Sequence, residues 1–141
     1  MDSSYILDSS SLFTLFFIDS EEVVQKIMKE SYVLDLTGYE IGSILTKGND
    51  GHIKGLERKL ILDLTKEIEK VVAKIRVIKL EPLDIAEIMK LSLSTGLTFY
   101  DASYVFYCKL HQVALLTDDK EMYREALKLG LKVKKIEEVF S

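Results

Sequence analysis

Acidic residues occupy four strand-to-helix junctions of the predicted chain: Asp8, Glu40, Asp101, and Asp118 or Asp119. The carboxyl ends of parallel strands lie along one edge of a sheet, so acids far apart in the sequence would meet there. Gathered carboxylates repel one another and raise each other's pKa, a cost that a bound divalent cation cancels. Oxygen ligands favour Mg²⁺ or Mn²⁺, which activate water and stabilise the leaving oxygen in phosphodiester hydrolysis. These acids therefore predict metal-dependent phosphodiester chemistry.

Each acid also has a simpler explanation, because acids near helix starts often serve as caps. Thr98 is a good N-cap residue, with Asp101 at the third helical position behind it. Thr37 and Glu40 repeat the same spacing. Capping explains any one of these acids taken alone, whereas four acids converging on one sheet edge call for a bound cation.

Strands alternate with helices along the chain, which predicts a parallel α/β sheet. Apolar runs predict strands at Tyr5–Asp8, Tyr32–Leu36, Val77–Leu80 and Val113–Leu116, with 132–136 as an edge strand. Helical spacing predicts helices over 12–18, 20–28, 39–47, 56–74, 84–94, from 98 onward and over 121–129. The glycine-rich segment 48–55 is predicted to be a loop, and 137–141 a short tail.

Composition limits the class of protein. With 141 residues, 48% of them hydrophobic and 30% charged, the chain has the profile of one globular domain, 1–141. Its net charge of −4 argues against a surface that coats nucleic acid generally, although a local basic patch is compatible with it. No apolar run approaches the roughly 20 residues of a membrane span, and Met1–Ser4 lacks the basic segment of a secretory signal. We therefore expect a cytoplasmic protein, and its many Lys residues with few Asn, Gln and Cys are typical of a thermophile.

Four short motifs each contain one of these acids: Tyr5–Ser10, Tyr39–Leu45, Leu97–Ala102 and Leu115–Lys120. In this order they resemble the acidic motifs of the PIN-domain ribonucleases, and most closely those of VapC-type toxins from toxin–antitoxin pairs. The resemblance covers nearly the whole chain. It implies a three-layer α/β/α fold with a mostly parallel sheet of about five strands, and a Mg²⁺- or Mn²⁺-dependent endoribonuclease. It also implies a homodimer and a small antitoxin that binds near the 39–47 helix.

The resemblance also implies roles for individual residues. Asp119 matches the last acid better than Asp118, because the family pattern is Thr-x-Asp, and Asp118 stays a possible substitute ligand. Ser10 and Thr117 match small hydroxyl positions that would orient carboxylates or a water. The catalytic and metal-binding quartet is then Asp8, Glu40, Asp101 and Asp119.

Three other interpretations compete with a nuclease. A phospho-acceptor receiver domain would need an acidic pair after the first strand, where Asp8 is instead followed by serines. A haloacid-dehalogenase-type phosphatase would need an acid at the position of Ser10. A catalytically silent PIN-like module that binds RNA or protein has no such conflict, and only a test of metal-dependent cleavage separates it from an active nuclease.

Overall fold

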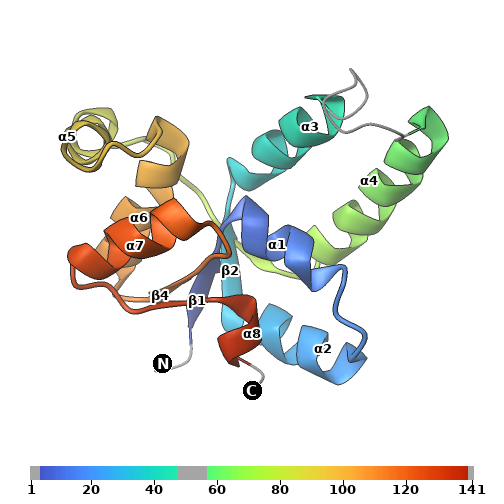
Figure 1. The fold of residues 1–141 in the computed structure, drawn as a ribbon. Coiled ribbons are helices and arrows are strands. Elements are labelled where there is room, and N and C mark those ends of the chain that lie inside the picture. Colours follow the sequence, from blue (N-terminus) through green and yellow to red (C-terminus); the bar gives the residue numbers. More distant parts are fainter. Residues whose placement is uncertain (1–3, 48–56, 140–141) are drawn as a thin grey trace.

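A parallel sheet of five short strands forms the centre of the computed structural model, which describes residues 4–47 and 57–139 (Figure 1). The strand order is β3-β2-β1-β4-β5, and every neighbouring pair is parallel. Parallel neighbours need crossover connections, and helices provide them here. The strands are β1 (Tyr5–Leu7), β2 (Ser31–Leu34), β3 (Arg76–Ile78), β4 (Ala114–Leu116) and β5 (Val133–Lys134).

Helices cover both faces of this sheet. Figure 1 shows α5, α6 and α7 on one side, with α1, α2, α3, α4 and α8 on the other. The bounds are α1 (Ser9–Leu15), α2 (Glu21–Glu30), α3 (Thr37–Lys47), α4 (Arg58–Val72), α5 (Ile85–Thr95), α6 (Phe99–His111), α7 (Lys120–Lys128) and α8 (Ile136–Val139).

Successive strand residues point into two separate cores. Ile6 and Leu115 pack with α6 residues such as Tyr104, whereas Leu7 and Leu116 pack with helices of the other face. Side chains along a strand alternate between the two faces of its sheet, so a strand that is covered on both sides must be apolar at every position. This requirement explains the continuous apolar runs from which the strands were predicted.

The predicted fold class, three-layer α/β/α with about five parallel strands, is confirmed. Several boundaries differ from the prediction. The first helix is Ser9–Leu15 where 12–18 was predicted, and the third strand is Arg76–Ile78 where Val77–Leu80 was predicted. The second strand is Ser31–Leu34, because Asp35 and Leu36 already turn toward α3. Residues 136–139 form α8, where the end of the edge strand 132–136 and the start of a tail were predicted; Ile136 is buried against the sheet. The predicted loop 48–55 lies outside the described residues.

Local signals in the sequence set several helix ends. Ser20 and Thr98 cap α2 and α6 through their hydroxyls, and Gly96 ends α5 in the left-handed region at φ 78°. Thr37 departs from the predicted pattern: it is the first residue of α3, and its hydroxyl contacts Tyr104 instead of capping the helix. In the described part of the chain, no helix is long and apolar enough to cross a membrane.

Candidate metal centre at the carboxyl edge of the sheet

Strand register places Asp8 beside Thr117. Leu7 pairs with Leu116, so the residues that follow them leave adjacent strands at the same level. The backbone N–H of Asp8 donates to the Leu116 carbonyl at 3.2 Å, which continues the strand pairing by one step. Only 2% of Asp8 is exposed. The carboxylate of Asp8 therefore lies inside the protein, at the centre of the carboxyl edge of the sheet.

The Asp8 carboxylate accepts hydrogen bonds on both oxygens. Oδ1 accepts from the Ser11 backbone N–H at 2.9 Å and from the Ser10 hydroxyl at 2.8 Å, and Oδ2 accepts from the Thr117 hydroxyl. The Ser11 bond makes Asp8 the N-cap of α1. Burial raises the pKa of Asp8, although these hydrogen bonds oppose the rise. Capping and a position in the acidic cluster are therefore combined in one residue.

Ser10 and Thr117 connect Asp8 to the start of α7. The Ser10 oxygen accepts from the Asp118 backbone N–H at 3.0 Å, and the Thr117 oxygen accepts from the Asp119 N–H at 3.0 Å. Since each hydroxyl has one proton and donates it to Asp8, the backbone N–H groups fix the direction of both donors. The two hydroxyls hold Asp8 in one orientation.

Tyr104 holds Glu40 from the opposite side of the cluster. Its hydroxyl donates to Glu40 Oε1 at 2.6 Å, so the Thr37 hydroxyl, 2.7 Å away, must be the donor in its own contact with Tyr104. Burial raises the pKa of Glu40, the Tyr104 bond lowers it, and the negative charge of Asp8 raises it further. Glu40 is thus oriented by a relay of two hydroxyls.

Asp101 reaches the cluster by a route that the sequence analysis did not predict. It lies in the first turn of α6 and follows α5, so its junction joins two helices and is not a strand-to-helix junction. Because β4 follows α6 directly, α6 runs back along the sheet and its first turn lies at the carboxyl edge. Burial, and then the charges of Asp119, Glu40 and Asp8, raise the pKa of Asp101 to about 6. These charges identify the four acids as electrostatic neighbours.

Asp118 and Asp119 have different environments. Asp118 accepts from the Thr14 hydroxyl on one oxygen and from the Ile136 N–H at 3.1 Å on the other. It therefore ties α1 to the start of α8. Asp119 caps α7 through Oδ1, which accepts from the Met122 N–H at 2.8 Å, and its Oδ2 has no hydrogen bond to any described residue. Asp119 has the open oxygen that a ligand needs.

The donor set suits a hard divalent cation that keeps part of its water shell. None of the four acids forms an ion pair with a basic residue of ranges 4–47 and 57–139. In the same ranges, no three His, Cys, Asp or Glu side chains are arranged to hold one ion together. Mg²⁺ commonly binds through one or two carboxylates and retains several waters. The acids therefore have the oxygen-ligand chemistry that suits Mg²⁺ or Mn²⁺, although the described residues do not form a preassembled set of three ligands.

Tyr104 is a residue at this edge to which the sequence analysis gave no role in the site. It is fully buried, yet its hydroxyl ends at Glu40. One signal could have identified it. Tyr104 follows Asp101 by three residues, a spacing that places both on one face of α6.

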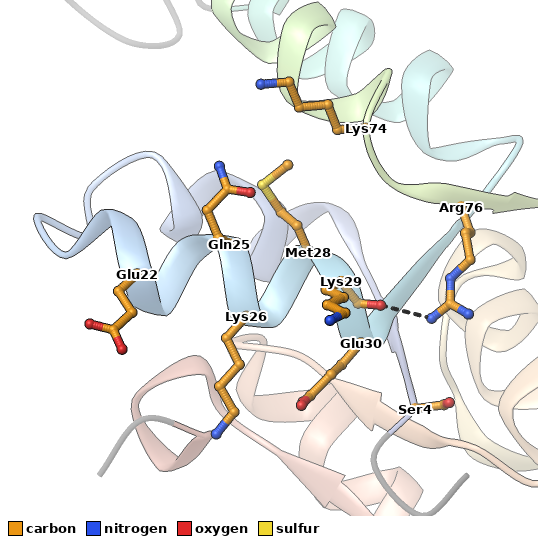
Figure 2. A pocket seen from close by; sticks show the side chains of 9 residues that line it. All are labelled: Ser4, Glu22, Gln25, Lys26, Met28, Lys29, Glu30, Lys74 and Arg76. Carbon is orange, nitrogen blue, oxygen red and sulfur yellow. Dashed lines mark hydrogen bonds between the residues drawn. The ribbon is translucent and has the colours of Figure 1, made fainter.

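A hollow of about 840 Å³ lies at the opposite, amino edge of the sheet (Figure 2). Arg76 at the start of β3 donates to the Lys29 carbonyl at 3.1 Å and to the Tyr32 hydroxyl at 2.9 Å, and it stacks on the Tyr32 ring. This charge is already satisfied. The residues that line the hollow are Ser4, Glu22, Gln25, Lys26, Met28, Lys29, Glu30, Lys74 and Arg76.

Comparisons with known proteins agree with the fold. The profile of the family described as PIN domain matches residues 5–127. The exonuclease VapC9 of Pyrobaculum aerophilum is 30% identical over 122 residues, which cover 86% of this chain and 85% of that protein. A crystal structure of a Pyrobaculum aerophilum protein superposes with a TM-score of 0.78 at 24% identity, covering 99% of this chain and 88% of that one. A toxin–antitoxin complex from Klebsiella pneumoniae gives 0.56 at 16% identity, covering 85% and 90%.

Proposed function

Because the chain belongs to the PIN-domain family, we propose that it is a metal-dependent endoribonuclease of the VapC type, acting in the cytoplasm. The single observation that carries this proposal is the environment of the Asp101 carboxyl group, which lies among three other acids. Its pKa is raised to about 6 by burial and by three neighbouring acids, and no basic residue of the described chain pairs with it. Unneutralised acids at a ligand-binding sheet edge are suited to recruiting a cation and, through it, a phosphate group.

The residues divide into those that would hold the ion and those that position them. Asp8, Glu40, Asp101 and Asp119 would supply its carboxylate ligands. A bound Mg²⁺ or Mn²⁺ would screen the phosphate charge and lower the pKa of a water. Hydroxyl groups position the carboxylates, and they do so before any substrate binds. These positioning residues are Ser10, Thr117, Tyr104 and Thr37.

Cleavage of unpaired and structured RNA in Mn²⁺ or Mg²⁺, with EDTA as the control, tests the proposal. Asp101→Asn should reduce the cleavage rate by at least about a hundredfold, since carboxylate ligation contributes several kcal/mol to such sites. The matched control is Asp19→Asn, which removes one exposed acid between α1 and α2. Undiminished cleavage in EDTA, or full activity in Asp101→Asn, would overturn the proposal.

A circular RNA distinguishes cleavage of internal bonds from cleavage at the ends of the substrate. The Pyrobaculum relative is named an exonuclease, whereas we propose that this chain cleaves internal bonds. A circular substrate has no ends, so an endonuclease must linearise it and an exonuclease must leave it intact. An intact circle beside a degraded linear RNA of the same sequence would refute internal cleavage alone.

The proposed antitoxin would dock between α3 and α4. A hollow of about 380 Å³ separates these helices, lined by apolar residues that include Leu45, Ile61 and Leu62. An amphipathic antitoxin helix would fill it with its apolar face. Leu62 is 55% exposed, so Leu62→Glu should abolish co-purification with a co-expressed antitoxin while leaving cleavage intact. The proposed homodimer is checked separately by light scattering of the chain alone.

A further inference from the structure

Two exposed tyrosines border a hollow next to the acidic cluster. This hollow has a volume of about 560 Å³, within the range typical of small-molecule sites. It lies where β2 leads into α3 and where α6 begins, and we refer to it as the tyrosine hollow. Tyr39 is 82% exposed and Tyr100 is 55% exposed. Its lining includes Asp35, Leu36, Tyr39, Leu83, Phe99 and Tyr100.

Sequence adjacency ties this hollow to the acids. Tyr39 directly precedes Glu40, and Tyr100 directly precedes Asp101. Consecutive Cα atoms are about 3.8 Å apart, so the backbone positions of the two tyrosines adjoin those of two of the four acids, while consecutive side chains of a helix point to different sides. Ser103, on the same hollow, directly precedes Tyr104, which holds Glu40. A nucleotide with its phosphate at the acids would therefore have the hollow within reach of its base.

The chemistry of the lining favours an uncharged ring over a phosphate. Its surface is mostly apolar, and its ionisable groups other than tyrosine are the carboxyls of Asp35 and Glu81, without any Lys or Arg. Two carboxylates would repel a phosphate. Asp35 Oδ2 accepts from the Leu80 N–H at 3.1 Å, and Oδ1 has no hydrogen-bond partner among the described residues. A carboxylate oxygen readily accepts from the amino group of a base, as it does from cytosine N4.

We propose that the tyrosine hollow is a nucleobase subsite, in which a base of unpaired RNA beside the cleaved phosphate stacks on Tyr39 or Tyr100. Aromatic side chains bind unpaired bases by stacking, which tolerates sequence, and polar groups at the edge then select among bases. The free oxygen of Asp35 favours bases with an amino group, adenine, cytosine and guanine, over uracil. This subsite rests on the proposed nuclease function and gives its substrate class as single-stranded RNA.

Steady-state kinetics with short unpaired oligo(A), oligo(C) and oligo(U) test the subsite. Tyr39→Ala and Tyr100→Ala should each raise KM about tenfold with little change in kcat, because a lost stack weakens binding of ground state and transition state alike. Tyr39→Phe and Tyr100→Phe keep the ring and should retain the wild-type KM. Phe17→Ala, which removes an exposed aromatic ring of the turn after α1, is the matched control.

Base preference and binding provide independent measurements. Asp35→Asn should reduce the preference for oligo(C) over oligo(U). On the cleavage-deficient Asp101→Asn background, a 2-aminopurine oligonucleotide should be quenched on binding, and Tyr39→Ala and Tyr100→Ala should weaken that binding about tenfold. Quenching also occurs without cleavage, so it reports the stack itself.

The outcomes separate this inference from the proposed function. If wild type cleaves no RNA in Mn²⁺, the nuclease proposal fails and the subsite fails with it. If wild type cleaves, but both alanine variants keep its KM, base preference and quenching, the subsite alone is refuted. A drop from dimer to monomer in those variants, with KM unchanged, would show instead that a second copy of the chain covers the hollow.

Discussion

The two edges of the sheet carry charge in opposite ways. At the amino edge, Arg76 donates to a carbonyl and a tyrosine hydroxyl, and basic and acidic side chains share an open hollow. At the carboxyl edge, Asp8 and Asp101 belong to a cluster of one sign. Burial raises the pKa of Asp8, and burial together with the charges of the other three acids raises the pKa of Asp101. The hollow of about 840 Å³ is thus at an edge where four basic side chains face two acidic ones, and where Arg76 is already hydrogen-bonded.

We therefore expect the function to reside in the buried cluster of like charges and not in the larger, exposed hollow of mixed charge. Exposed mixed charges are solvated and contribute little to stability. Buried like charges destabilise the metal-free protein, and the cost persists only where something outside the chain relieves it. The predictions below test whether the two edges differ as this argument requires.

The largest expected difference is catalytic. Asp119→Asn at the carboxyl edge should reduce the cleavage rate by about a hundredfold, because it removes the acid with an open oxygen. Lys26→Gln at the amino edge also changes one charge and should leave the rate unchanged. Rates are measured on one RNA in Mn²⁺. Equal losses in both variants would end the distinction between the edges.

Metal should stabilise the protein only through the carboxyl edge. Mn²⁺ at about a hundred times its Kd should raise the free energy of unfolding by about 2.7 kcal/mol, because it binds the native state alone. Asp101→Asn should lose most of that gain, yet melt no lower than wild type without metal, since asparagine removes repulsion and retains much of the capping ability. Thermal melts with Mn²⁺ and with EDTA check this. If the residue only caps α6, its loss should lower stability equally in both conditions.

Stability without metal should fall as pH rises from about 4 to about 7. The Asp101 carboxyl has a pKa of about 6 in the native state and an ordinary value of 3.8. In that window the native protein binds more protons than the unfolded chain, so the slope of unfolding free energy against pH is negative. The melting temperature in EDTA should therefore drop by a few degrees. Asp101→Asn should flatten the slope, whereas Lys74→Gln at the amino edge should preserve it.

Tyr104→Phe should produce the smallest effects. Removing the hydroxyl leaves the Glu40 carboxylate and the Thr37 hydroxyl without their partner. We expect a loss of about 1 kcal/mol in unfolding free energy and about a tenfold loss in activity. Denaturant melts and cleavage rates measure the two. Loss of stability with full activity would restrict Tyr104 to packing.

The sequence predicted much of the carboxyl edge because strand ends are local features. The apolar run 5–7 ends at Asp8, and the run 114–116 ends just before Thr117. Since parallel strands share one edge, these residues could be brought together without coordinates. The same reasoning gave the wrong junction for Asp101, which follows a helix. It could not detect α8, whose start depends on Asp118 from another element.

The sequence by itself determined the strands, several helix caps and the residue types that gather at the site, because strand burial and capping depend on neighbours within a few positions. Only the tertiary structure decided which hydrogen-bond partner each of these side chains has. The Thr37 hydroxyl turns to Tyr104 instead of capping α3, and Asp118 serves α1 and α8 while its neighbour Asp119 keeps an open oxygen. Each choice joins elements distant in sequence, and packing fixes their separation to within the few tenths of an ångström that a hydrogen bond requires.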